Sequence, residues 1–327
     1  MAPAGIEIER ILCPVDFSEF SGRALERAVR LGNWFEARVE ALHVIPFVMP
    51  ANAGLPYFPS PVVTTPARRE QSAQELARFV EPFLSEGVPI ETRVREGDPW
   101  RVIRDEAEAL PADILVMGTH GLSGFEHLLL GSVTEKVLRR APCPVLTVGT
   151  VPAQPRTGPL FRRILCAVDL TAASEQTLDM ALSLAGENDA RITLLHVVES
   201  LPAATGGRLY LAVPEIGPLR RHLVEQTTQR LREAVPEKAR DFCDVGERVE
   251  TGTAWRQILR VAEEVDADLI VMGEHSRGVL GRAFFGATSG HVVRQASCPV
   301  LVVPETKARH RARSEPVKTK AVEVKIA

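Results

Sequence analysis

The sequence predicts an α/β protein made of two tandem doubly wound domains, each a five-stranded, mainly parallel sheet with helices on both faces. Three observations lead to this class. The 327 residues suffice for two domains of ordinary size. The chain repeats itself, and in each repeat short apolar runs alternate with helical patterns. Hydrophobic residues make up 45% of the chain, enough for substantial cores.

The repeat is direct. RILCPVDFS (10–18) returns as RILCAVDLT (163–171). Residues 93–148 align with 248–303 without a gap, and 23 of the 56 positions are identical. This agreement indicates a tandem duplication of about 150 residues. We therefore expect a first domain at 1–150, a linker at 151–160, a second domain at 161–305 and a basic, disordered tail at 306–327.

Short apolar runs predict the strands of the first repeat. Several are apolar throughout, as expected for strands covered on both faces. The runs lie at 11–15, 39–45, 90–94, 114–117 and 145–148. Parallel sheets of this kind bind ligands at the carboxyl ends of their strands.

An amphipathic helix is predicted before the third strand. Pro82 should kink this helix or shift its start. Its apolar stripe consists of Leu76, Phe79, Val80, Phe83 and Leu84. Pro-rich stretches at 46–66 and 199–218 are expected to form mobile loops.

Composition and missing motifs exclude several function classes. The net charge of -3 argues against a nucleic-acid partner. No apolar run approaches the roughly 18 residues of a membrane span, and the first residues lack a signal-peptide core, so we expect a cytoplasmic protein. The five cysteines are scattered without a CxxC pair, which favours buried reduced thiols over disulfides or a metal site. Neither a Walker P-loop nor a dinucleotide fingerprint is present.

The most informative segment follows the fourth strand. Gly118-Thr-His-Gly121 precedes nine residues and then Gly131-Ser132, at the start of a predicted helix. Glycines let the main chain approach a ligand, and the unpaired amides of a helix start suit phosphate. The structural alternative is a capping box formed by Ser132 and Glu135.

Together with three flanking segments, this motif resembles the universal stress protein family. The flanks are Val15-Asp16-Phe17-Ser18 after the first strand, His43-Val44 in the second strand, and the closing Pro142-Cys-Pro-Val. The resemblance covers nearly all of 8–150 and 161–305. It implies ATP, or AMP or ADP, bound at the strand carboxyl ends, and leaves a companion Mg²⁺ open.

Carried over by position, the resemblance assigns twelve residues to the nucleotide, and no catalytic or metal-binding residue. Those beside adenine and ribose are Pro14, Val15, Asp16 and Val44; those along the ribose and phosphate path are Met117, Gly118, His120 and Gly121; those at the phosphates are Gly131, Ser132, Val133 and Thr134. Asp16 would accept a hydrogen bond from the ligand, although it could instead cap the first helix. His43 and His196, in mid-strand, are more typical of packed core.

The second repeat carries an altered motif. Ser276 replaces a glycine, Ala287 replaces the phosphate-facing hydroxyl, and Glu274 adds negative charge near the expected phosphate path. We therefore predict weak nucleotide binding, or none, in this domain. Asp169 and Val197 are retained, which leaves a smaller adenosine-like ligand open.

The resulting functional hypothesis is a nucleotide-responsive stress regulator whose binding orders the first Pro-rich loop and residues 121–131. The alternatives are a nucleotide-independent interaction scaffold, a slow ATPase, or an enzyme of the adenine-hydrolysing α/β type, although the SGGxDS-like loop of that last type is missing. The two repeats are expected to pair as a pseudo-dimer through 143–148 and 298–303. Protein partners are unidentified, and a homodimer of the whole chain is left open.

Overall fold

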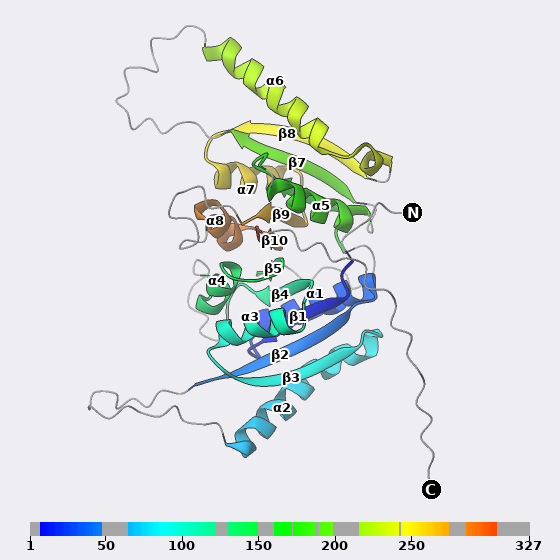
Figure 1. Cartoon of the computed structure of the whole chain (residues 1–327), viewed down its shortest axis with the longest axis vertical. Coiled ribbons are helices and arrows are strands. Elements are labelled where there is room, and N and C mark those ends of the chain that lie inside the picture. The colour runs from blue at the N-terminus through cyan, green and yellow to red at the C-terminus, as the bar shows by residue number, and fades with distance from the viewer. Residues whose placement is uncertain are drawn as a thin grey trace, which may run out of the picture.

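The structure is a computed structural model, shown in Figure 1. It describes residues 7–47, 65–121, 130–149, 160–171, 173–186, 190–198, 216–241, 243–274 and 286–305. The predicted tail, residues 151–159 of the predicted linker and the central parts of both Pro-rich stretches lie outside the described residues, as do residues 122–129.

Strands and helices alternate along each repeat. The first repeat contains β1 (Arg10–Val15), α1 (Glu19–Phe35), β2 (Arg38–Pro46), α2 (Pro66–Val80), the 3₁₀ helix η1 (Glu81–Glu86), β3 (Ile90–Gly97), α3 (Pro99–Ala109), β4 (Ile114–Gly118), α4 (Ser132–Leu138) and β5 (Val145–Val148). The second contains β6 (Arg163–Ala167), α5 (Ala173–Gly186), β7 (Arg191–Val198), α6 (Ile216–Ala234), η2 (Glu237–Asp241), β8 (Asp244–Thr251), α7 (Ala254–Glu264), β9 (Leu269–Gly273), α8 (Ala287–Gln295) and β10 (Val300–Val303).

The strands form one sheet in the order β3-β2-β1-β4-β5-β10-β9-β6-β7-β8. Pairing is parallel within each repeat. In each half the chain order reverses at the first strand, between β1 and β4 or between β6 and β9, and a doubly wound sheet binds ligands at such a switch point. The predicted fold class is confirmed, with the difference that the sheets of the two domains are continuous.

The domains join through antiparallel pairing of β5 and β10, within the segments that the sequence predicted. The pairs are Val300 with Thr147, Leu301 with Leu146, and Val302 with Val145. Leu301 lies 155 positions after Leu146, which is the offset of the repeat here, so each leucine faces its own counterpart. The hydroxyl of Thr147, 1% exposed, donates to the carbonyl of Val300 at 3.0 Å. The two repeats are therefore related by an approximate two-fold axis through this pair of strands.

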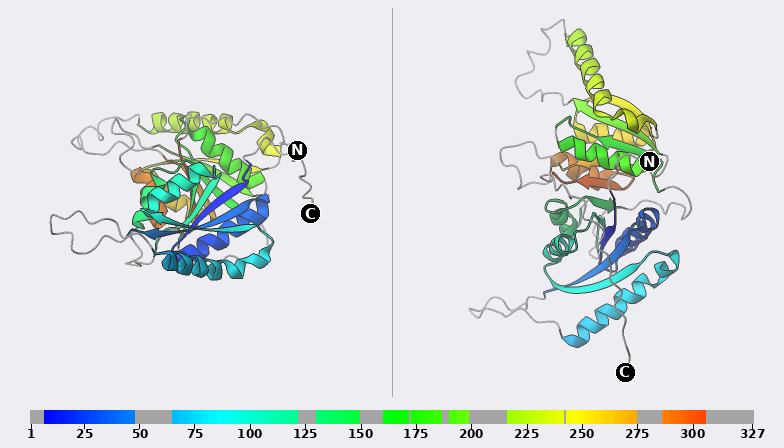
Figure 2. Two further views of the ribbon diagram at one scale, coloured as in Figure 1. Left: turned by 60° about the horizontal axis from the view of Figure 1, so that its bottom comes forward. Right: turned by 45° about the vertical axis from the view of Figure 1, so that its right-hand side comes forward.

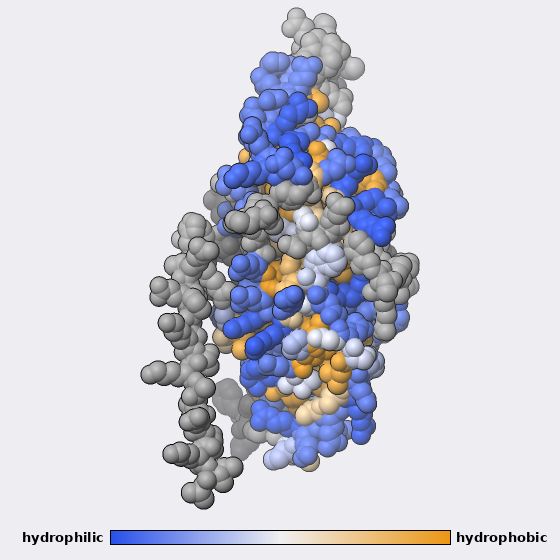
Figure 3. All heavy atoms as spheres, turned by 90° about the vertical axis from the view of Figure 1, so that its right-hand side faces the viewer, coloured by the Kyte–Doolittle hydropathy of each residue, from blue (hydrophilic) through white to orange (hydrophobic). Residues whose placement is uncertain are grey.

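Helices cover both faces of the sheet, as the two views of Figure 2 show. One core packs α1, α2, α5 and α6 against the sheet, and a second core packs α3, α4, α7 and α8 against the other face. The strands are consequently buried on both sides, which explains their continuously apolar runs. On the face drawn in Figure 3, hydrophilic side chains prevail and hydrophobic ones form small patches.

Pro82 ends the α-helical part of the predicted helix before its last turn. Because proline cannot donate to the preceding turn, α2 ends at Val80 and the chain continues as η1. The tighter 3₁₀ turn moves Leu84 off the predicted apolar stripe, and its side chain is 55% exposed. Leu76 and Val80 are buried as predicted, and Phe79 and Phe83 pack against the core. Among the described helices, none combines the length and apolar character that a membrane crossing requires.

Candidate functional site

A cavity of about 590 Å³ opens at the carboxyl ends of β1, β2 and β4, at the switch point of the first domain. Each of the twelve residues assigned from the sequence lines it. They come from four segments that are distant in the chain, the ends of β1, β2 and β4 and the start of α4. The fold thus brings the whole predicted set to one place. A volume of this size is typical of small-molecule and cofactor sites.

One wall of this cavity is apolar. Val44 of β2 and Met117 of β4 are buried, line the cavity and belong to the core on the α3–α4 face of the sheet. Ile103 of α3 adds a third apolar residue of the same core. A flat aromatic ring in this slot would leave little apolar surface in water.

The turn after β1 holds Asp16 by several hydrogen bonds. Oδ1 of Asp16 accepts from the amide of Ser18 at 3.1 Å and from its hydroxyl at 2.6 Å. Ser18, not Asp16, is the N-cap of α1, because its Oγ accepts from the amide of Ser21 at 3.2 Å. Between them Phe17 has a φ of 66°, which only the surrounding contacts can maintain in a non-glycine residue. The capping alternative for Asp16 is therefore wrong, and its role is to shape the turn beside the cavity.

His43 fixes the other side of this turn. Its Nδ1 lies 2.8 Å from the carbonyl oxygen of Val15, and its ring lies 4.4 Å from that of Phe17. The second domain repeats the first contact, with Nδ1 of His196 2.9 Å from the carbonyl of Val168. Each histidine holds the end of the first strand of its domain, and each also lines the pocket there.

Each glycine of the motif stands at a position where a side chain would meet a different group. At Gly121 a Cβ would lie 2.5 Å from Oδ2 of Asp16, inside the cavity wall. A Cβ at Gly131 would lie 3.2 Å from its nearest neighbour, the carbonyl oxygen of Thr119. At Gly118 a Cβ would lie 2.8 Å from the Cβ of Phe20, so the packing of α1 against β4 requires glycine at this position. Gly118 lines the cavity as well, so its place in the predicted site stays a prediction beside this packing requirement.

The start of α4 leaves amides open to the cavity. Gly131 is the N-cap and forms no side-chain cap, which contradicts the capping-box alternative for Ser132. Glu135 instead pairs with Arg139. Thr134 donates its hydroxyl to the carbonyl of Gly118 at 2.9 Å.

Two backbone bonds frame this helix start. The amide of Gly131 donates to Thr119 at 2.8 Å, and that of Glu135 donates to Gly131 at 2.9 Å. Between them, no hydrogen bond is found from the amides of 132–134 to any group in the described part of the chain. These three donors are therefore available to a ligand.

Sequence reasoning missed one wall of the cavity. The first turns of α2 contribute Arg68, Gln71, Ser72 and Glu75. No local signal marks them, because α2 follows the Pro-rich stretch and its position over the cavity is a tertiary property. Of the described residues that line the cavity, one is a lysine or an arginine, and that residue is Arg68.

The cysteines are packing residues. Cys13 lies in β1 and Cys166 at the same place in β6, and both are fully buried. Burial raises the pKa of the Cys166 thiol to about 12 and that of Cys13 further, so both remain protonated at neutral pH. The expectation of small buried hydrophobes is confirmed.

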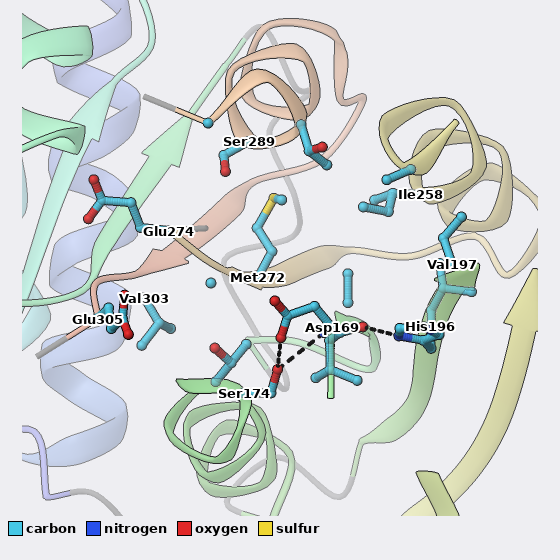
Figure 4. A pocket seen from close by; sticks show the side chains of 18 of the residues that line it. Asp169, Ser174, His196, Val197, Ile258, Met272, Glu274, Ser289, Val303 and Glu305 are labelled. Atoms are coloured by element: carbon cyan, nitrogen blue, oxygen red, sulfur yellow. Dashed lines mark hydrogen bonds between the residues drawn. The ribbon is translucent and has the colours of Figure 1, made fainter. Parts of the chain in front are cut away.

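The second domain contains its own pocket at the equivalent switch point, of about 330 Å³. Figure 4 shows it from close by. Asp169, Val197 and Glu274 line this pocket, as do Gly286 and Ala287. Ser276, the predicted glycine replacement, lies outside the described residues.

Fold and site together define a doubly wound α/β protein with a ligand-sized pocket at the switch point of each of two fused domains. The chain belongs to the universal stress protein family, whose model matches residues 7–149 and 160–304.

Individual proteins similar to this chain are universal stress proteins as well. A universal stress protein of Methanocaldococcus jannaschii is 37% identical over 143 residues, 43% of this chain and 81% of that protein. One of Mycolicibacterium smegmatis is 27% identical over 298 residues, 90% of this chain and 96% of that protein. The crystal structure of a universal stress protein from Archaeoglobus fulgidus covers 91% of this chain and 98% of its own, with a TM-score of 0.60 and 22% identity. That last likeness extends the fold agreement to both domains together.

Proposed function

We propose that this protein is a cytoplasmic stress regulator that holds an adenine nucleotide, ATP, ADP or AMP, in the pocket of its first domain. The observation that carries the proposal is the convergence of free amides, a carboxylate and an apolar slot on one cavity. The amides are those of Ser132, Val133 and Thr134, and the carboxylate is that of Asp16.

Each part of the cavity suits one part of a nucleotide. Val44, Met117 and Ile103, which share one face of the sheet, would form the surface for adenine. Asp16, whose Oδ1 is held by Ser18, would accept from a ribose hydroxyl or a base amine. The open amides at 132–134 would donate to phosphate oxygens, and the exposed hydroxyl of Ser132 adds another donor. A companion Mg²⁺ belongs to the proposal as an open element, which titration with and without Mg²⁺ tests.

The regulatory part of the proposal follows from where these groups stand. A nucleotide held by both Asp16 and the amides at 132–134 would connect the β1–α1 turn to the start of α4, two segments on opposite faces of the sheet. Binding would then change the conformational freedom of both segments and of the surface near them. Protein partners could bind the nucleotide-loaded and nucleotide-free forms with different affinities.

The direct test is native mass spectrometry of the freshly purified chain, followed by calorimetric titration with ATP, ADP and AMP, with and without Mg²⁺. We expect co-purified adenine nucleotide, saturable binding at one site, and slower hydrogen exchange at 14–21 and 131–138 on binding. A chain that carries no nucleotide and gives no heat with millimolar ATP would instead support the nucleotide-independent scaffold. Binding without any change in exchange would retain the site and reject the regulatory response.

A further inference from the structure

A smaller cavity of the first domain lies at the opposite edge of the sheet from the pocket proposed for the nucleotide. It has a volume of about 170 Å³ and opens at the amino ends of β1, β2 and β3, beside the residues that follow α3. Its charged lining consists of Arg10, Arg38, Glu40 and Glu91. The proposed function uses none of these side chains.

The two arginines lie side by side at the start of β1 and β2. Arg10 is the register partner of Arg38 in the parallel pair, so both side chains leave the same face of the sheet. Nη1 of Arg10 donates to the carbonyl of Leu110 at 3.0 Å, at the end of α3. Within the part of the chain that the structure describes, neither guanidinium has a carboxylate partner at ion-pair distance. Two cations are thus held together beside the cavity.

The second repeat contains the same two arginines together with carboxylate partners. Arg163 and Arg191 are register partners in β6 and β7, at the positions of the first pair. Nη2 of Arg163 donates to Oδ2 of Asp266 at 3.0 Å. Nε of Arg191 donates to Oδ2 of Asp244 at 2.6 Å. In the first repeat the positions of both aspartates hold proline, namely Pro111 and Pro89.

The backbone beneath the arginines is the same in both repeats. A carboxylate accepts from the amides of the β1 or β6 arginine and of the residue before it, from Asp113 in the first repeat and Asp268 in the second, at 2.8–3.0 Å. The two repeats therefore differ in the partners of these arginines and not in the way that the chain presents them. The first domain keeps a carboxylate-binding pair whose own carboxylates are missing.

Two different carboxylates line the cavity in their place. Glu40 and Glu91 are register partners in β2 and β3, two residues, about 6.6 Å, beyond the row of the arginines. The second repeat has Thr193 and Gly246 there. Glu40 pairs with Arg93 at 2.7 Å, whereas Glu91 is exposed and has no ion-pair partner among the described residues. Positive and negative groups thus line one cavity in separate rows, without pairing with each other.

We propose that this cavity binds a small free amino acid, with its carboxylate at Arg10 and Arg38 and its ammonium group toward Glu91. Guanidinium groups are well suited to carboxylates, and the second repeat pairs the same two positions with carboxylates. An ammonium group donates three hydrogen bonds, which a carboxylate can accept.

The size and exposure of the cavity set the expected ligand and affinity. Its volume of about 170 Å³ lies below the roughly 300–1,000 Å³ that is typical of pockets for drug-sized ligands, so a small molecule is expected. Exposed ion pairs contribute little individually, so we expect millimolar affinity. The site does not depend on the nucleotide proposed for the other edge of the sheet.

Arginine Nε–H signals report on this site in the full chain. The chain would be labelled with ¹⁵N-arginine, with Arg38→Lys and Arg191→Lys used to assign two signals by nuclear magnetic resonance. Arg191 is an internal reference, because its Nε already donates to Asp244. Alanine is then titrated, together with propionate, which lacks the amine, and ethylamine, which lacks the carboxylate.

We expect alanine to shift the Arg38 signal at a concentration at least fivefold below that needed for propionate. Ethylamine should leave this signal unchanged, and Arg191 should respond to none of the three. Equal potency of alanine and propionate would reduce the site to a general anion contact and reject the amino acid. An Arg38 signal that does not move at tens of millimolar alanine, or that moves no more than that of Arg191, would overturn the proposal.

Exchanging residues between the repeats tests where the site comes from. Pro89→Asp places beside Arg38 the carboxylate that the second repeat has beside Arg191, and should abolish the response of Arg38 to alanine. Asp244→Ala should make Arg191 respond to propionate and alanine equally, because Gly246 stands at the position of Glu91. An unchanged Arg38 response in the Pro89→Asp chain would reject the assigned contact.

A matched pair of charge changes tests the ammonium end. Glu91→Gln should remove the preference for alanine over propionate at Arg38. Glu70→Gln makes the same change at an exposed position outside the cavity and should leave the preference intact. Equal effects of the two variants would attribute the preference to overall charge and contradict the role of Glu91.

Discussion

Oδ2 of Asp16 lies 2.5 Å from the point where a Cβ at Gly121 would stand. The two residues are 105 positions apart in the chain and meet at the wall of the first pocket. A side chain at position 121 must therefore displace the carboxylate of Asp16. Because Oδ1 is held by Ser18, that displacement also breaks the turn after β1.

Gly121→Ala is accordingly expected to weaken ATP binding at least tenfold, about 1.4 kcal/mol, while the fold survives. Gly121→Val should abolish binding. The matched control is Gly246→Ala in β8, where a Cβ would meet nothing within 4 Å. Calorimetric titration measures the affinities, and circular dichroism checks the fold.

Asp16→Ala should also weaken ATP binding strongly, because the acceptor is lost. In this background Gly121→Ala should add much less than it does alone, since its clash partner has been removed. The double-mutant cycle, measured by the same titration, gives the coupling directly. Strictly additive losses would show that the two residues act independently and that the contact is irrelevant to binding.

Stability and binding should separate at the start of α4. Thr134→Val removes the bond from Oγ1 to the carbonyl of Gly118, in a side chain that is 4% exposed, and should lower the free energy of unfolding by about 1–3 kcal/mol. Ser132→Ala changes an exposed hydroxyl and should stay within about 0.5 kcal/mol, yet weaken ATP binding. Urea unfolding and titration of both variants check this. The reverse pattern would refute the roles assigned to the two hydroxyls.

The seam between the domains, the paired strands β5 and β10, gives a second stability prediction. Thr147→Val leaves the buried carbonyl of Val300 without its side-chain donor, and should cost about 1–3 kcal/mol of unfolding free energy. Thr147→Ser keeps the hydroxyl and should cost less. Because one sheet runs through both domains, both variants should still unfold in a single transition, monitored by urea titration. Two separate transitions would indicate that the seam contributes little cooperativity.

The buried thiols predict a pH dependence. Burial raises the pKa of Cys143 and Cys166 to about 12, from an ordinary value of 9.0. Above about pH 9 the unfolded chain loses these protons while the native chain keeps them, so native stability is full below pH 9 and falls as pH rises. Each such thiol contributes a slope of up to about 1.4 kcal/mol per pH unit.

Thiol labelling at pH 8 gives a simpler readout of the same burial. The native chain should react with a thiol reagent very slowly, and the chain in denaturant should react at all five cysteines. Rapid labelling of a native thiol would contradict the buried environment. Peptide mapping would identify which cysteine reacted.

Much of the site was predictable because it is encoded locally. Apolar runs mark the strands, and residues directly after them reach the pocket because parallel strands end at the same edge of a sheet. Asp16 and Gly121 both follow such strands, and the glycine spacing and the family resemblance single them out among the residues there. The packing role of Gly118 could not be predicted, since its missing side chain makes room for Phe20 of α1. Nor could that of Arg68, whose place in the lining depends on how α2 lies over the sheet.

The sequence by itself determined the duplication, the strand positions, the fold class and four of the segments that form the first pocket, because each is encoded in a short window of chain or in its repetition. Tertiary structure decided that the two sheets are one, that Gly131 and not Ser132 is the N-cap of α4, and that the first turns of α2 form one wall of the first pocket. The physical reason is common to these cases. Space, hydrogen-bond partners and local charge belong to groups brought together from distant parts of the chain, and no local pattern records them.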